Sequence, residues 1–166
     1  MRTKGFTFWI MLLARSIVAE AQASDKRINS IRTEVDAITQ NLSTYRKTAK
    51  RLEGISKDAK GVYFTSESGL KKIDAKIYGN TGRSDNEYYY RGDRLIFGIN
   101  RWTKYDRSII AGPVKPIQVV ETIAYFDAGE CFALFVDGKA VQTDTKEWTE
   151  KLYEVVATSS IFQRRL

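Results

Sequence analysis

EYYYRGDRLIFGINRW, residues 87–102, predicts a β-hairpin. The tyrosines of its first arm and Leu95-Ile96-Phe97 of its second arm have strong strand preference. Gly92 between the arms suits the first central position of a two-residue type II′ turn, because glycine accepts a positive φ. The other strands are expected to build outward from this hairpin.

The turn sets the register of the hairpin. With Gly92 and Asp93 as its central residues, the expected cross-strand pairs are Arg91 with Arg94, Tyr90 with Leu95, Tyr89 with Ile96 and Tyr88 with Phe97. Side chains alternate between the two faces of a sheet. One face is therefore expected to carry Tyr88, Tyr90, Leu95, Phe97 and Ile99, and the other Tyr89 and Ile96.

Two other stretches have the same form. Each has an aromatic pair, a glycine-bearing turn and a returning apolar strand, and they begin at Tyr63-Phe64 and at Tyr125-Phe126. Repeated hairpins of this kind predict an antiparallel meander of six or seven strands over residues 55–143. The expected fold class is α+β, because helical patterns lie on both sides of this region.

The hairpin pattern also carries a resemblance. Residues 89–95 (YYRGDRL) and 125–132 (YFDAGECF) are similar to the repeated aromatic-aromatic-x-x-Gly-x-Leu hairpins of uncharacterised exported bacterial proteins. They resemble MORN-type and antitoxin-like repeats more loosely. The resemblance covers residues 61–141 at most. It implies an exported hairpin fold and carries over no active-site residue.

A strict heptad pattern precedes the sheet region. Its apolar residues are Ile28, Ile31, Val35, Ile38, Leu42, Tyr45, Ala49 and Leu52. With no proline or internal glycine, and with Gly54 as a stop, this spacing predicts one long helix over residues 24–54. Two interpretations stay open: the helix packs across the sheet, or it forms a coiled coil with a second copy and makes a homodimer.

Residues 144–166 predict a C-terminal helix and tail. Asp144 and Glu147 resemble a capping box at the start of the helix. The helix is expected to end near Ser159 and to be followed by a solvated tail. Its apolar stripe, expected to pack on the sheet, consists of Trp148, Leu152 and Val155.

The N-terminus has the layout of a secretory signal. Residues 1–4 are basic, residues 5–14 (GFTFWIMLLA) are an apolar run, and Ala21-Gln22-Ala23 is a small-x-small cleavage site. The apolar run is shorter than the about 20 apolar residues that a bilayer span needs. Cleavage is expected after Ala23 and would leave no membrane span. Arg15 interrupts the apolar core, so an uncleaved, membrane-associated N-terminus is the alternative.

Cleavage would remove three basic residues and one acidic residue from a chain of net charge +7, leaving +5. The mature chain, residues 24–166, is expected to be one domain. It has a single cysteine and therefore no internal disulfide. That fits the bacterial envelope, periplasmic or secreted, better than a eukaryotic secretome.

Composition narrows the possible chemistry. The chain has no histidine, which removes the commonest general base and the commonest metal ligand. Its one cysteine, Cys131, lies in an apolar run and is interpreted as a core residue. No phosphate-binding, dinucleotide-binding or calcium-loop motif is present. No catalytic residue, metal or cofactor is therefore expected.

Basic and aromatic residues mix along the central hairpin. On a sheet face such a mixture could bind polyanions or stack on sugars or bases. The residues expected to contact a ligand are Arg91, Arg94, Arg101, Trp102 and Tyr105. Alternatively, the aromatic residues are core and the cations surround it. Export argues against nucleic acid and leaves an anionic glycan, a cell-wall polymer or a protein as the partner.

Long loops on rigid sheets often carry binding contacts. The connection over residues 103–118 holds both prolines and is either such a loop or a plain crossing at the sheet edge. The expected function is a non-enzymatic, exported binding module. Two alternatives are a secreted inhibitor that inserts residues 80–83 into a hydrolase, and a carboxylate hydrolase that uses Glu87 or Glu121.

Overall fold

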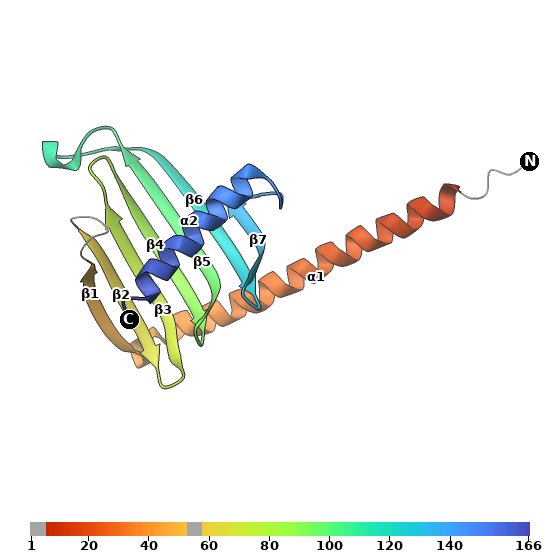
Figure 1. The fold of residues 1–166 in the computed structure, drawn as a ribbon, viewed down its shortest axis with the longest axis horizontal. Coiled ribbons are helices and arrows are strands. Elements are labelled where there is room, and N and C mark those ends of the chain that lie inside the picture. Colours follow the sequence, from red (N-terminus) through yellow and green to blue (C-terminus); the bar gives the residue numbers. More distant parts are fainter. Residues whose placement is uncertain (1–5, 53–57) are drawn as a thin grey trace, which may run out of the picture.

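The computed structural model describes residues 6–52 and 58–166, with the side chains of the first helix described from Gln22 onward. These residues form an eight-stranded antiparallel sheet with one helix on each face (Figure 1). The elements in chain order are α1 (Phe6–Gln40), the 3₁₀ turn η1 (Leu42–Thr44), β1 (Arg46–Leu52), β2 (Ala59–Ser66), β3 (Gly69–Tyr78), β4 (Gly82–Arg91), β5 (Arg94–Tyr105), the 3₁₀ turn η2 (Ile109–Ala111), β6 (Pro116–Asp127), β7 (Glu130–Val136), β8 (Lys139–Ala140) and α2 (Lys146–Gln163).

The predicted α+β class and antiparallel meander are confirmed. Strands adjacent in sequence pair throughout, in the order β1 to β8. The strand number is eight, and the prediction of six or seven was too low. The reason is β1, which lies in the part of the chain predicted to be helix.

The three aromatic-pair hairpins share one geometry. In each, the returning strand carries one extra residue just after the turn, so that two residues of that strand oppose one residue of the outgoing strand. The extra residues of these β-bulges are Lys71, Ile96 and Phe132. Along the outgoing strand the side chains alternate, so each aromatic pair contributes a large side chain to both faces of the sheet.

The bulge corrects the predicted register of the central hairpin. Arg91 pairs with Arg94 and Tyr90 with Leu95, as expected, and Gly92 has a positive φ of 62°. Beyond the bulge the predicted pairs are wrong by one residue. The observed pairs there are Tyr89 with Phe97 and Tyr88 with Gly98. Phe97 therefore lies on the same face as Tyr89. The prediction, which assumed strict alternation without a bulge, had placed it on the opposite face.

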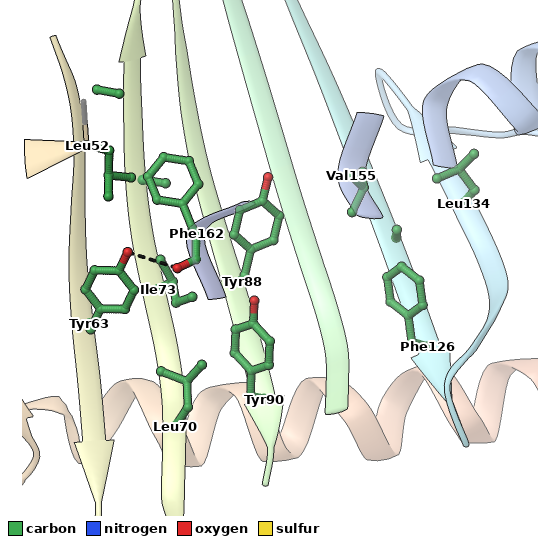
Figure 2. Close-up of a cluster of buried hydrophobic side chains, with 13 residues drawn as sticks. Leu52, Tyr63, Leu70, Ile73, Tyr88, Tyr90, Phe126, Leu134, Val155 and Phe162 are labelled. Atoms are coloured by element: carbon green, nitrogen blue, oxygen red, sulfur yellow. Dashed lines mark hydrogen bonds between the residues drawn. The ribbon is translucent and has the colours of Figure 1, made fainter. Parts of the chain in front are cut away.

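Helix α2 covers one face of the sheet and closes the larger apolar cluster (Figure 2). Val155 and Phe162 of α2 are fully buried there against Tyr63, Tyr88 and other strand residues. The stripe predicted from Trp148, Leu152 and Val155 packs on this cluster, which confirms it.

Helix α1 crosses the opposite face near the end of the sheet where the β2–β3, β4–β5 and β6–β7 turns lie (Figure 1). Its residues Ile28, Ile31 and Ile38 are buried against an aromatic row from the sheet. In that row the ring centroids of Phe97 and Tyr125 are 5.0 Å apart. The heptad seam therefore packs on the sheet over this stretch, and the sheet occupies the surface that a coiled coil would use.

The predicted helix over residues 24–54 is wrong in its second half. Helix α1 ends at Gln40, and residues 46–52 form β1, which pairs with β2 along its whole length. Leu52 at the end of β1 reaches the α2 cluster, whereas Tyr45 packs on the α1 cluster. Pairing with an otherwise open sheet edge outweighs the helical spacing of these residues.

The start and end of α2 also differ from prediction. Its N-cap is Thr145, whose side chain accepts a hydrogen bond from the backbone N–H of Trp148, and Asp144 precedes it with a positive φ. The helix continues to Gln163. The tail is not free, because Lys50 of β1 donates to the backbone carbonyls of Arg165 and Leu166 at 2.6 and 2.7 Å.

Most of the evidence for the predicted signal peptide lies outside the residues and side chains that the structure describes. Residues 1–4 and the side chains of the apolar run lie outside the described residues, while the backbone of residues 6–40 is one helix. Among the residues that the structure describes, no helix is long and apolar enough to cross a bilayer.

Gly98 lets α2 approach the sheet closely. A Cβ atom at this position would lie 2.9 Å from Cγ1 of Val155 and 3.3 Å from Cδ1 of Tyr88. We expect Gly98→Ala to lower the free energy of unfolding by about 1–2 kcal/mol, because a well-packed core resists an added methyl group. Chemical denaturation measures this. The loss should shrink in a Val155→Ala background, and an unchanged loss there would contradict the clash.

Candidate functional site

Strand β5 separates the residues predicted to bind a ligand. Arg101 points to the α1 face, where its guanidinium pairs with the Glu121 carboxylate across the strands. Trp102 points to the α2 face and is 42 % exposed. These two neighbours therefore cannot contact one ligand on one face.

The other predicted contacts lie elsewhere. Arg91 and Arg94 flank the β4–β5 turn at the far end of the hairpin, where Arg91 pairs with Glu34 of α1. Tyr105 is half-buried at the end of β5, and its backbone N–H donates to the Thr81 carbonyl. The five residues thus occupy three separate places.

The α1 face beside Arg101 is charged but internally neutralised. Four basic and four acidic side chains alternate across β3 to β6. They are Lys72, Lys76, Arg83, Arg101, Asp74, Asp85, Glu87 and Glu121. Their ion pairs include Lys72 with Glu87 at 2.8 Å and Arg83 with Asp85 at 2.6 Å. A polyanion would have to break these pairs, so this face is a poor site for one.

The α2 face holds a cavity of about 420 Å³ between the helix and strands β4 to β6. Its lining combines one aromatic plane with uncharged polar groups and one ion pair. The lining residues are Ser84, Asn100, Trp102, Val120, Thr122, Lys151, Glu154 and Thr158. A concave site with few polar groups around an apolar surface is the usual form of a small-ligand site.

Hydrogen bonds below the cavity hold two of its polar groups in place. The buried Tyr88 hydroxyl donates to Oδ1 of Asn100 at 2.8 Å, and Ser84 Oγ donates to Oδ1 of Asn86 at 2.8 Å. Asn86 in turn donates to the Ala75 carbonyl at 3.4 Å. The amide NH₂ of Asn100 makes no hydrogen bond within the described part of the chain, so it can donate to a ligand.

Burial raises the pKa of Tyr88, against the smaller effects of hydrogen bonds with Thr158 and Asn100. The Tyr88 hydroxyl therefore stays protonated and keeps Asn100 in one orientation. At the opposite wall Lys151 pairs with Glu154 at 2.9 Å, which leaves the cavity without an unpaired cation among these lining groups.

Glycine makes room for Trp102. A Cβ atom on Gly82 would lie 2.8 Å from the Thr103 carbonyl oxygen and 3.5 Å from the indole nitrogen of Trp102. The indole therefore lies directly beside the backbone of β4. Trp102 nevertheless remains partly exposed.

The residues that sequence reasoning missed are polar and lie in register with Trp102. Asn100 precedes it by two residues, Ser84 is its cross-strand partner, and Thr122 pairs with Asn100. Polar side chains on what should be an apolar face of a covered sheet were the available signal. No sequence signal indicated that Lys151, Glu154 and Thr158 of α2 would line the cavity, because their position depends on how the helix docks.

Metal ligands, the single cysteine and Glu87 are the remaining candidates for chemistry. No cluster of three metal-ligating side chains occurs among the residues with described positions. Burial raises the pKa of the Cys131 thiol to about 11, as expected of a core cysteine. Burial alone would raise the pKa of Glu87, but Lys72 outweighs it and the net pKa is lowered.

The chain matches no family model, no curated protein and no solved structure.

Proposed function

We propose that this chain is an exported, non-enzymatic binding module that holds a sugar residue of an envelope glycan in the cavity beside α2. The observation that carries this is Trp102, a half-exposed indole that lines one cavity together with uncharged donors and acceptors. The apolar face of a sugar ring can stack on an indole, while its hydroxyls exchange hydrogen bonds with Asn100, Ser84 and Thr122. Export is supported by the N-terminal sequence.

The cavity favours an uncharged sugar over an anionic one. Among the described lining residues the one cation is Lys151, which is paired with Glu154. The face with more cations is neutralised by its own carboxylates. An uncharged ring would satisfy the polar groups of the cavity without breaking an ion pair.

The alternatives have less support. A carboxylate hydrolase needs a general acid of raised pKa, whereas the pKa of Glu87 is lowered and Glu121 is paired with Arg101. For the inhibitor, the turn at residues 79–82 is tied to its neighbours: its Asn80 carbonyl accepts from the backbone N–H of Ile109 at 2.8 Å. No specific feature there favours an enzyme as partner.

A glycan array probed with the purified chain tests this proposal, followed by titration calorimetry on the glycans that bind. We expect Trp102→Ala to weaken binding about tenfold or more, as loss of a large aromatic anchor does. The melting temperature should change little, because the indole is half-exposed.

Tyr153→Ala is the matched control, since Tyr153 is an exposed aromatic on the outer face of α2. It should bind like the parent. Equal affinity of parent and Trp102→Ala would contradict the site. Binding restricted to anionic glycans and abolished by salt would contradict the proposed ligand class.

A further inference from the structure

The β5–β6 connection presents apolar side chains to solvent at the end of the sheet away from α1 (Figure 1, between β5 and β6). Ile110 at its tip is 83 % exposed, and Ile109 beside it is also exposed. Where β6 begins, Ile117 and Val119 are 59 % and 51 % exposed. Four β-branched apolar residues therefore lie exposed in one short segment.

The exposure comes from a structured loop. At its neck the backbone N–H of Asp106 donates to the Lys115 carbonyl, and the N–H of Lys115 donates to Oδ1 of Asp106, each at 2.9 Å. At the tip the N–H of Ile109 donates to the Asn80 carbonyl at 2.8 Å, and Ser108 Oγ caps η2 by accepting from Ile110. These hydrogen bonds fix the backbone of the loop with the isoleucine side chains exposed, although the hydrophobic effect favours their burial.

The connection that carries this apolar tip is also basic. The segment over residues 104–118 has three basic residues and one acidic one, a net charge of +2. The acidic one, Asp106, is used in the neck and in an ion pair with Arg107 at 3.2 Å. Lys104 and Lys115 make no ion pair with any residue that the structure describes. The connection therefore carries two ammonium groups without an ion-pair partner among the described residues, together with the exposed isoleucines.

We propose that this loop inserts its tip into the surface of an anionic lipid bilayer. Ile109 and Ile110 would enter the boundary between headgroups and acyl chains, and Lys104 and Lys115 would meet the lipid phosphates. A protein groove would bind the isoleucines but gives no role to the unpaired lysines of the same connection. This inference is independent of the sugar cavity, which involves the α2 face and different side chains.

The test places an environment-sensitive fluorophore at the tip, using Ile110→Cys in a Cys131→Ser chain. The full chain is mixed with vesicles of phosphatidylglycerol and phosphatidylethanolamine, or with phosphatidylcholine vesicles. We expect the emission of the label to rise and shift to the blue with the anionic vesicles. The same label on Ser68→Cys, in the exposed β2–β3 turn at the other end of the sheet, should not respond. The loop also lies at the opposite end of the molecule from the first turns of α1, so the signal reports the loop itself (Figure 1).

Charge variants complete the test. Each lysine should contribute about fivefold to the lipid concentration at half-response. The double variant Lys104→Ser/Lys115→Ser should therefore raise that concentration. The double variant Arg46→Ser/Lys47→Ser on β1 loses the same charge and should not raise it. No response at position 110, or an equal response at positions 110 and 68, would overturn the proposal. A response without vesicles that grows with protein concentration would also overturn it, in favour of contact between copies.

Discussion

Replacing Phe162 by alanine should lower the free energy of unfolding by about 3–5 kcal/mol, the largest loss expected from any single substitution considered. Phe162 is fully buried near the end of α2, and its ring fills the space that Gly61 leaves open, 3.1 Å from the position of a Cβ there. Its carbonyl accepts from the Tyr63 hydroxyl at 3.0 Å (Figure 2). Loss of the ring leaves a cavity between α2 and β2.

Thermal unfolding followed by circular dichroism measures this loss, and the melting temperature should fall by about 6–20 °C. Ile161→Ala is the control, because this neighbouring side chain is exposed on the same helix. It should change stability by less than about 0.5 kcal/mol. A loss for Phe162→Ala as small as that for Ile161→Ala would show that the end of α2 contributes little to the core.

The first half of the heptad pattern was informative because a helix on a sheet and a helix in a coiled coil bury the same stripe. Ile28, Ile31 and Ile38 lie where the pattern put them, on one buried face. The second half failed because the spacing that makes a helical stripe does not prevent a strand. Tyr45 and Leu52 meet opposite clusters, and only the partner strand β2 reveals this.

The central hairpin shows the same limit on a smaller scale. Turn chemistry at Gly92 predicted the first two cross-strand pairs correctly, since it depends on local backbone geometry. The bulge at Ile96 lets two consecutive residues, Ile96 and Phe97, pack with Tyr89 under α1. No local sequence rule indicates that a second helix will cover the sheet.

The candidate site was predictable in one residue only. Trp102 was chosen for its neighbours in sequence, Arg101 and Tyr105, yet the strand sends Arg101 to the other face. The residues that surround its ring come from β4, β6 and α2. Their convergence follows from register and helix docking, and these are properties of the fold and not of any one stretch.

Lys72→Met should lower the free energy of unfolding by about 2–3 kcal/mol, because it breaks a buried ion triad. The Lys72 side chain is 7 % exposed and lies 2.8 Å from both the Asp74 and the Glu87 carboxylates. These carboxylates belong to directly opposed residues of β3 and β4. Without the lysine they would repel one another. Their exposure, 36 % each, limits the loss to less than that of a fully buried pair.

The pH dependence of this loss identifies its cause. The pKa of Glu87 is lowered despite burial, so its stabilising effect is present above the unfolded pKa of about 4.3 and is lost as pH falls through the folded pKa. Burial likewise opposes the raised pKa of Lys72, whose hydrogen bonds with Asp74 and Glu87 outweigh it. The effect of Lys72 persists until pH rises above about 10.4.

The stability difference between parent and Lys72→Met should therefore be constant from about pH 7 to 10. It should shrink in acid, as pH falls first through the folded pKa of Glu87 in the variant, which burial raises, and then through its lowered folded pKa in the parent. Urea denaturation of both proteins across this whole pH range measures it. Tyr89→Phe is a useful comparison, since it removes only the hydroxyl that donates to Glu87 at 3.0 Å and keeps the ring beneath the Lys72 ammonium. It should show a smaller loss with the same fall at low pH. A difference that stays constant down to pH 3 would mean that the methionine disturbs packing and that the triad's charges contribute nothing.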